Sequence, residues 1–411
     1  MKLVIAGGYD TQNLGDHAML QVLMRDLRWR NVVPRVTVLS RHPDTDFDRH
    51  YGVTSIPNLD HGSQEAARGK VFRGLNGEQD SGDLQQLTQQ IAEADALVIG
   101  GGRMLVDYTH GFQRGHLSYF VLLATLARCH GTKIILFAHS LETLSSESGA
   151  EHLRFLVQNA DHVSLREQSS LEVLRAIDPS LIDERIEVLP DPALGLSLVS
   201  PYYGEKLPTL RDDLPVLAVN LRSYAWRDGS TANFEGRVVS WLNALRRERE
   251  LQLLFVPQMT YDVDSGETDD RVIARRVMAA LEHSEGVHSI ESPLLVDEAL
   301  GVYRHADAVL SMRRHGAVFA ATQGVPVLPL SCEANTDYVS KSLGLDAWRV
   351  DVSANDHRPS VENTLALLDS ASEVGKKLRA RCFEFGQQAH GYADAIVRAI
   401  ESKPTPKEVA V

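Results

Sequence analysis

The chain has 411 residues, of which 43% are hydrophobic, and a formal net charge of −13. This length predicts two domains of about 200 residues each, and the acidic balance argues against a nucleic-acid-binding protein, which would need a basic face. Its three cysteines are far apart, which argues against a disulfide framework or a zinc site, and no apolar run reaches the roughly 18 residues that span a bilayer.

The first apolar stretch, residues 3–6, is too short for a signal peptide and predicts a buried first strand, so we expect a cytoplasmic protein. From there the first half of the chain alternates short β-branched runs with amphipathic stretches, a pattern typical of a parallel, doubly wound sheet. The expected strands are residues 3–6, 36–39, 96–99, 133–137, 162–165 and 186–189. The expected helices are residues 14–27, 84–94, 117–129 and 169–176, and the weakly patterned stretch 42–83 is expected to be a long loop with at most one short strand.

The alternation restarts after a proline-containing segment, residues 197–215, which we predict to be a linker. The second set of expected strands is 216–221, 251–256, 287–290, 308–310 and 326–330. The second set of expected helices is 235–249, 271–281, 296–304, 317–322 and 338–343, followed by a long helical region at 361–400. We therefore predict Rossmann-like domains at 1–196 and 216–380, and a C-terminal helix and tail at 381–411 that pack back onto the first domain.

Two open α/β domains of this kind, joined by a linker and followed by a C-terminal helix, are the architecture of the GT-B glycosyltransferases. In open α/β sheets, ligands bind beyond the carboxyl ends of the strands. In a GT-B arrangement these ends face each other across a cleft, so functional residues are expected where the predicted strands end.

Glycine-containing turns follow the first and third predicted strands. In the first turn, Asn13 and Asp16 can cap the following helix or point into the cleft, and a plain helix-capping turn is an equal alternative. The spacing fits neither the dinucleotide fingerprint nor a P-loop. In the second turn, Gly100, Gly101 and Gly102 precede Arg103 and predict an anion-binding nest of accessible N–H groups; the alternative is steric, with glycine where two loops cross.

Arginines follow three further predicted strands, two of which are described first. Arg166 follows the strand at 162–165, where it either faces the cleft, oriented by Asp191, or pairs with Glu167 or Asp161 on the surface. Arg222 follows the first strand of the second domain.

The most informative cluster is Arg313, Arg314 and His315, placed where a strand should end and a helix begin. Fixed cations, an imidazole and helix N–H groups together make a receptor for a phosphorylated, carboxylated small molecule. A lone histidine is more often structural, but the neighbouring arginine and glycine favour a functional one here.

Together, these sites resemble the polysaccharide pyruvyltransferase family. The resemblance runs from residue 1 to about 345 and rests on Asn13-Leu14-Gly15-Asp16, Gly100-Gly101-Gly102, Arg166-Glu167-x-Ser169, Asp191-Pro192-Ala193, and Arg313-x-His315 followed by Gly324-x-Pro326. It implies a GT-B-like fold and transfer of a pyruvyl group from phosphoenolpyruvate to two hydroxyls of a sugar in a cell-surface polysaccharide precursor. The products would be a cyclic ketal and phosphate, with phosphoenolpyruvate as co-substrate and neither cofactor nor metal.

The chain departs from the family pattern at two places. Arg314 stands where the family usually has leucine, and Cys332-Glu333-Ala334-Asn335 stands where it usually has a lysine after an aromatic residue. Lys341 is too far along the chain to substitute for that lysine. Either Arg314 restores the charge or the donor or acceptor differs, and both alternatives stay open.

The resemblance and the residues assign roles as hypotheses. Arg313, with Arg222, Arg166 and Arg314, would bind donor phosphate and carboxylate, and the second domain would be the donor side. His315 would move protons, and Asp16, across the cleft on the acceptor side, would serve as the base for the acceptor hydroxyl. Asn13, Gly100, Gly101, Gly102 and Arg103 would contact the acceptor or support its loops.

The expected partners are the small-molecule donor and a sugar or lipid-linked saccharide, without nucleic acid. A lipid-linked acceptor would bring peripheral contact with the inner membrane face. Two other functions remain open: a GT-B glycosyltransferase that uses a nucleotide sugar on the same cations, and a catalytically degenerate member that binds sugar or phosphate as a sensor or scaffold.

Overall fold

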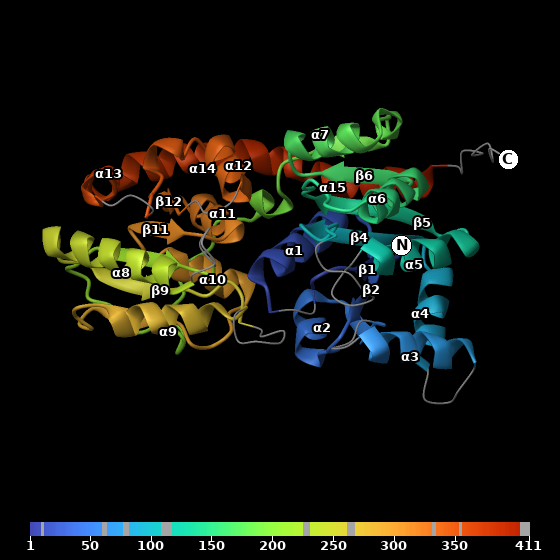
Figure 1. Cartoon of the computed structure of the whole chain (residues 1–411), viewed down its shortest axis with the longest axis horizontal. Coiled ribbons are helices and arrows are strands. Elements are labelled where there is room, and N and C mark those ends of the chain that lie inside the picture. Colours follow the sequence, from blue (N-terminus) through green and yellow to red (C-terminus); the bar gives the residue numbers. More distant parts are fainter. Residues whose placement is uncertain are drawn as a thin grey trace. The chain divides into compact units, whose positions relative to one another are not determined.

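The structure is a computed structural model (Figure 1) that describes residues 1–9, 12–59, 64–76, 82–107, 117–224, 231–260, 268–330, 334–352 and 356–402. Contacts divide the chain into two compact units. Unit 1 comprises Met1–Asp10, Met19–Pro192 and Gln388–Val411, and unit 2 comprises Thr11–Ala18 and Ala193–Gln387. Residues 197–215, predicted as a linker, and residues 381–387, predicted with the C-terminal helix, therefore belong to unit 2, as does the segment Thr11–Ala18.

Among the described residues, unit 1 contains a seven-stranded parallel sheet in the order β3-β2-β1-β4-β5-β6-β7. The direction of winding reverses between β1 and β4, as in other doubly wound folds. The strands are β1 (Lys2–Ala6), β2 (Arg35–Ser40), β3 (Thr54–Pro57), β4 (Ala96–Gly102), β5 (Lys133–His139), β6 (His162–Leu165) and β7 (Ile186–Val188). The helices are α1 (Leu14–Trp29), α2 (Thr45–Tyr51), α3 (Gln64–Leu75), α4 (Gly82–Ala92), α5 (Leu117–Cys129), α6 (Glu147–Asn159), α7 (Gln168–Ile177) and α15 (Gly391–Glu401), with the short 3-10 turn η2 (Pro179–Leu181). Helix α1 begins in unit 2 and enters unit 1 at Met19, and the 3-10 turn η3 (Pro192–Gly195) enters unit 2 at Ala193.

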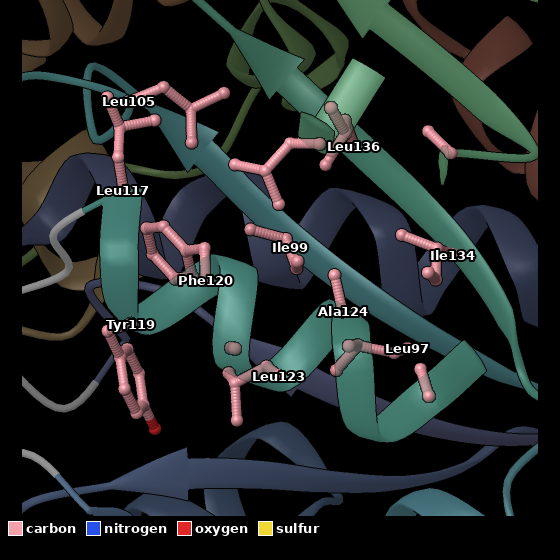
Figure 2. Close-up of a cluster of buried hydrophobic side chains, with 14 of the residues drawn as sticks. Leu97, Ile99, Leu105, Leu117, Tyr119, Phe120, Leu123, Ala124, Ile134 and Leu136 are labelled. Atoms are coloured by element: carbon pink, nitrogen blue, oxygen red, sulfur yellow. The ribbon is translucent and has the colours of Figure 1, made fainter. Parts of the chain in front are cut away.

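Helices cover both faces of this sheet because side chains alternate along each strand. Leu97 and Ile99 of β4 pack in a cluster with Phe120 of α5, which Figure 2 shows from close by. Val98 of β4 and Phe137 of β5 point to the other face and pack in the cluster that contains residues of α1 and α15. Complete burial of a side chain of this size stabilises the fold by about 1.5–3 kcal/mol.

The prediction of a long loop at residues 42–83 is wrong, because α2, β3 and α3 occupy much of it. Helix α2 is set by its ends rather than by apolar periodicity: the Asp44 side chain accepts a hydrogen bond from the Asp46 N–H at 2.8 Å, and Gly52 ends the helix with φ of 68°. Helix α6, which the sequence did not predict, is capped in the same way by Ser146.

The long helical region predicted at 361–400 is divided into three helices, α13 (Arg358–Asp369), α14 (Ala371–Ala389) and α15. Helix α15 contacts β5 and β6 in unit 1 (Figure 1), and the Tyr392 ring lies 5.2 Å from that of Phe137. The prediction that the C-terminal helix packs back onto the first domain is therefore confirmed for α15.

In the described part of unit 2, a second parallel sheet has five strands in the order β10-β9-β8-β11-β12. The strands are β8 (Val216–Asn220), β9 (Gln252–Phe255), β10 (Val287–Ser289), β11 (Ala308–Ser311) and β12 (Val327–Pro329). Besides α13 and α14, the helices are α8 (Thr231–Glu248), α9 (Asp270–Ala280), α10 (Val296–Tyr303), α11 (Arg314–Thr322) and α12 (Ala334–Leu343), with the 3-10 turn η4 (Asp346–Trp348). The core on one face gathers around Trp241 of α8, which is fully buried. Winding reverses between β8 and β11, so the expected binding crevice of unit 2 lies at their carboxyl ends.

Candidate active site

The carboxyl ends of β8 and β11 are joined by the side chain of Asn220, which is fully buried. Asn220 and Ser311 are register partners at the strand ends. The Asn220 Nδ2 donates to the Val256 carbonyl at 3.0 Å, and its Oδ1 accepts from the Arg313 N–H at 3.2 Å and from Ser311 Oγ at 3.3 Å. One amide therefore fixes the turn from β11 into α11 relative to the neighbouring strands.

Arg313 occupies the N-cap position of α11 and faces a buried carboxylate. Its Nε lies 3.0 and 2.9 Å from the two Asp270 oxygens, and its Nη2 lies 2.6 Å from Oδ1. Asp270 is 2% exposed and also accepts from the backbone N–H groups of Gln258 (2.9 Å) and Met259 (3.0 Å). Burial raises the pKa of the Asp270 carboxyl, and the Arg313 charge and the backbone N–H groups oppose that shift without cancelling it.

His315 is the second residue of α11, and its ring lies against the first turn of α1 within unit 2. A Cβ built on Gly15 would come within 1.9 Å of the His315 Nδ1. Any side chain at position 15 would therefore have to displace the imidazole. The glycine in Asn13-Leu14-Gly15-Asp16 thus has a steric reason, which is contact with the ring of His315.

The first turn of α1 is held by the segment that follows β9. The Leu14 N–H donates to the Gln258 carbonyl at 2.9 Å, and Asn13 forms an antiparallel bridge with Met259. The Asn13 side chain accepts from the Gly15 N–H at 3.0 Å. Since the N–H groups of Gln258 and Met259 donate to Asp270, residues 258–259 connect the start of α1 to the partner of Arg313. Both helix N-termini carry positive partial charge, which favours negatively charged groups near them.

The structure changes the expected position of Asp16. It is half-buried in the first turn of α1 and belongs to unit 2, together with His315, so the expectation that it lies across the cleft from His315 is wrong. The reason is that α1 begins beside the strand ends of unit 2, which its sequence position after β1 does not reveal. Arg222, beyond the end of β8, and Arg314, the first residue of α11, are half-buried in the same unit.

The predicted nest of accessible N–H groups in unit 1 is wrong, because Gly100, Gly101 and Gly102 are buried inside β4. The Gly101 N–H donates to the Tyr9 hydroxyl at 2.9 Å. Gly100 has φ of 140°, and a Cβ there would lie 2.1 Å from the Phe137 carbonyl oxygen. The steric alternative explains these glycines. Arg103, which follows, pairs with Glu142 at 2.6 Å.

Arg166 is 3% exposed and forms a buried ion pair with Asp191. Its Nη1 lies 2.8 Å from the Asp191 carboxylate, and its Nε and Nη2 donate to Ser140 Oγ at 3.1 and 2.8 Å. The structure therefore agrees with the alternative in which Asp191 orients Arg166. It does not agree with the alternative in which Arg166 pairs with Glu167 or Asp161 on the surface. A guanidinium held this way supports the strand ends of unit 1 and offers little surface to a ligand.

The sequence did not single out Asp270, Gln258 or the role of Asn220. Asp269 and Asp270 do carry a detectable signal, since acidic residues open an amphipathic helix there. Arg313, the partner of Asp270, lies 43 residues further on, which no local pattern reveals. Cys332 and Glu333, in the stretch that departs from the family, lie outside the described residues; Lys341 is exposed in the last turn of α12.

The described residues contain neither a metal-ligand cluster nor a membrane-spanning helix. Within them, no cluster of three or more His, Cys, Asp or Glu side chains is arranged to hold a metal ion. None of their helices is both long enough and apolar enough to cross a membrane.

A sequence profile described as "Polysaccharide pyruvyl transferase" matches residues 13–333, which is well over half of the chain. Curated proteins gave no match. Among solved structures, one from Listeria monocytogenes assigned as a UDP-N-acetylglucosamine 2-epimerase has a TM-score of 0.63 at 16% identity and covers 100% of this chain and 99% of its own.

Two other solved structures show the same likeness. The UDP-GlcNAc 2-epimerase from Neisseria meningitidis, bound to UDP-GlcNAc, has a TM-score of 0.58 at 12% identity and covers 97% of this chain and 99% of its own. The calicheamicin glycosyltransferase CalG4 has a TM-score of 0.53 at 14% identity, and the match covers 98% of this chain and 99% of CalG4. At such identities these matches show the fold alone, and the chain has the GT-B fold with two Rossmann-like units.

Proposed function

We propose, since this chain belongs to the polysaccharide pyruvyl transferase family, that it transfers a pyruvyl group from phosphoenolpyruvate to two hydroxyls of one sugar in a polysaccharide or glycan precursor. The products are a cyclic ketal and phosphate. The observation that carries the proposal is the position of Arg313 and His315 at the N-terminus of α11, with the His315 ring against the first turn of α1. That placement joins cationic groups, a proton-transfer group and helix N–H groups at one switch point.

The donor carries phosphate and carboxylate groups, so its receptor must supply positive charge and N–H donors. We assign this work to Arg313, Arg314 and Arg222 together with the N-termini of α11 and α1. Arg166 is left out because its guanidinium is buried against Asp191. In this proposal no metal ion is needed to bind the donor, because the arginines and helix ends neutralise its charge.

The chemistry begins with addition of a proton to the methylene carbon of phosphoenolpyruvate. The carbon that carries the phosphate oxygen becomes electrophilic, and the first sugar hydroxyl bonds to it and loses its proton. The second hydroxyl then forms the second C–O bond and loses its proton, while the C–O bond to phosphate breaks and phosphate leaves with the electron pair. One proton is consumed and two are released, so the surplus proton goes to phosphate or water.

His315 is proposed to hold and deliver these protons, because an imidazole nitrogen can both accept and donate a proton. Asp16, in the first turn of the helix that touches His315, is the candidate base for the acceptor hydroxyl. The acceptor is proposed to be a free or lipid-linked saccharide. A lipid-linked acceptor would require peripheral contact with the membrane surface.

The test measures phosphate release and ketal formation by purified protein with phosphoenolpyruvate and a panel of sugar acceptors. We expect His315→Ala and Arg313→Ala to lower turnover about 100-fold or more. His283→Ala and Arg275→Ala serve as matched controls, since both residues are exposed in unit 2 and lie outside the proposed site. Full turnover in the His315 and Arg313 variants would contradict the assignment.

The same assay separates the two alternatives. A GT-B glycosyltransferase would release nucleoside diphosphate from a nucleotide sugar and leave phosphoenolpyruvate unchanged. A degenerate family member would bind phosphate or sugar without turnover of either donor.

A further inference from the structure

We propose that Asp270 is a positioning residue that fixes the direction in which the Arg313 guanidinium presents its N–H groups. The inference rests on the proposed function, because it concerns the arginine assigned to the donor. Asp270 is fully enclosed and has no part in the chemistry above, yet it makes the closest polar contact of Arg313. A carboxylate in that position constrains the guanidinium without touching substrate.

The geometry determines which edge of Arg313 remains for a ligand. The edge formed by Nε and Nη2 is bound to both Asp270 oxygens, and Nη2 also lies 3.5 Å from the Thr268 carbonyl. Among the described residues Nη1 makes no hydrogen bond. A planar guanidinium held along one edge cannot rotate, so Nη1 points in one direction only.

The pair also changes what Arg313 contributes electrostatically. Its charge is matched by the Asp270 carboxylate at 2.6 Å, so together they are close to neutral. Arg313 therefore supplies a fixed donor rather than net positive charge. The excess charge that attracts an anionic donor comes instead from Arg314, Arg222 and the helix N-termini.

The Asp270 carboxylate is also held by backbone N–H groups. It accepts the N–H groups of Gln258 and Met259, and the Gln258 carbonyl accepts from Leu14 in the first turn of α1. The carboxylate that orients Arg313 therefore also holds the segment that places α1 beside His315. Both N–H groups donate to the same Asp270 oxygen, which the amide oxygen of Asn can replace, so Asp270→Asn changes mainly the contact with Arg313.

The experiment compares Asp270→Asn with Asp269→Asn. Asp269 is a matched control, because it is the adjacent residue, is 7% exposed and holds Arg271 through the same kind of two-oxygen pair. Calorimetry measures binding of inorganic phosphate, and steady-state kinetics with phosphoenolpyruvate and the acceptor gives kcat and KM.

For Asp270→Asn we expect kcat to fall about 10- to 100-fold, because a guanidinium that can turn misplaces the donor. Phosphate affinity should stay equal or increase, because the arginine regains its net charge. A purely structural role would leave kcat per folded molecule unchanged. The inference is overturned if Asp270→Asn and Asp269→Asn have the same kcat, or if Asp270→Asn weakens phosphate binding.

Two further variants keep the test decisive. Asp270→Asn combined with Arg313→Ala should be no slower than Arg313→Ala alone, whereas multiplied losses would contradict the inference. Arg313→Lys keeps the charge but cannot make the two-point contact, so it should reproduce the kcat loss even if Asp270→Asn fails to fold. Unchanged kcat in Arg313→Lys would refute the positioning role.

Failure of the proposed function gives a different result. A wild-type protein that makes no ketal with any acceptor contradicts pyruvyl transfer. In that case phosphate binding by Asp270→Asn and Arg313→Ala still tests the positioning role of Asp270. Loss of phosphate binding in Arg313→Ala together with full binding in Asp270→Asn supports the positioning role. Full binding in Arg313→Ala together with loss of binding in Asp270→Asn refutes it.

Discussion

Replacement of Gly15 by alanine tests whether the ring of His315 must lie against the start of α1. The new Cβ would lie 1.9 Å from Nδ1, where ordinary contact needs at least 3.4 Å, so the ring must move by about 1.5 Å. A displacement of roughly 1 Å at a catalytic group costs about 100-fold in rate. We therefore expect Gly15→Ala to lower kcat for pyruvyl transfer about 100-fold.

The gain in helix propensity offsets part of the cost of displacing the ring, so the stability of the fold should change little. Alanine is favoured over glycine inside a helix by about 0.8–1 kcal/mol, so the variant should remain folded while its turnover falls. Gly236→Ala is the matched control, since Gly236 lies in helix α8 of the same unit and a Cβ there meets nothing within 4 Å. That variant should keep full turnover and unfold at slightly higher urea concentration.

The assay is kcat for ketal formation, with urea unfolding as the measure of stability. Gly15→Ala combined with His315→Ala should be no slower than His315→Ala alone, because the displaced ring is already absent. Full turnover in Gly15→Ala would refute the reasoning, since either the ring would not lie at this contact or its position would not matter.

Three predictions concern stability and are checked by urea unfolding. His139 and His162 are buried, which lowers the pKa of each imidazole to about 4. Each histidine therefore contributes fully to the free energy of unfolding above pH 6.5, and this contribution, at most about 3 kcal/mol, is lost as the pH falls towards 4. His162→Gln should make the loss of stability between pH 8 and pH 5 smaller, and an unchanged loss would contradict this. Arg166→Met leaves the buried Asp191 carboxylate without its partner guanidinium and should cost about 3–5 kcal/mol at pH 7, whereas a cost below 1 kcal/mol would show that the carboxylate finds other donors. Asp107 accepts hydrogen bonds from the N–H groups of Ser145 and Ser146 at the start of α6. Asp107→Ala should therefore lower the free energy of unfolding by about 1–2 kcal/mol, and no change would mean that water replaces the carboxylate.

Much of the fold could be predicted because buried strands and their covering helices leave regular apolar patterns. Helix α5 (Leu117–Cys129) was predicted with the observed bounds, since its apolar side chains repeat at helical spacing. The patterns failed where a helix depends on its ends. Helices α2 and α6 rely on capping by Asp44 and Ser146, which look like ordinary loop residues in the sequence.

The candidate site could be predicted in part for a different reason. Arg313 and His315 follow a strand directly, so their position at the carboxyl edge of the sheet could be predicted from local sequence. Asp270 could not be paired with Arg313 in advance, because the contact joins the starts of two helices, α9 and α11, that meet only in the folded unit. The glycines at 100–102 misled for a related reason: whether such a run ends a strand or continues it depends on the neighbouring strand β5.

The packing of α15 has a consequence for the order in which the protein is made. Unit 1 needs residues from the end of the chain, because Tyr392 and Ile396 of α15 complete the face of the sheet that contains Leu3 and Ile5. A ribosome releases those residues after all of unit 2 has been synthesised. Until then α1 covers only part of this apolar face, so a fragment that ends at residue 192 should be prone to aggregation even though it carries all seven described strands of unit 1.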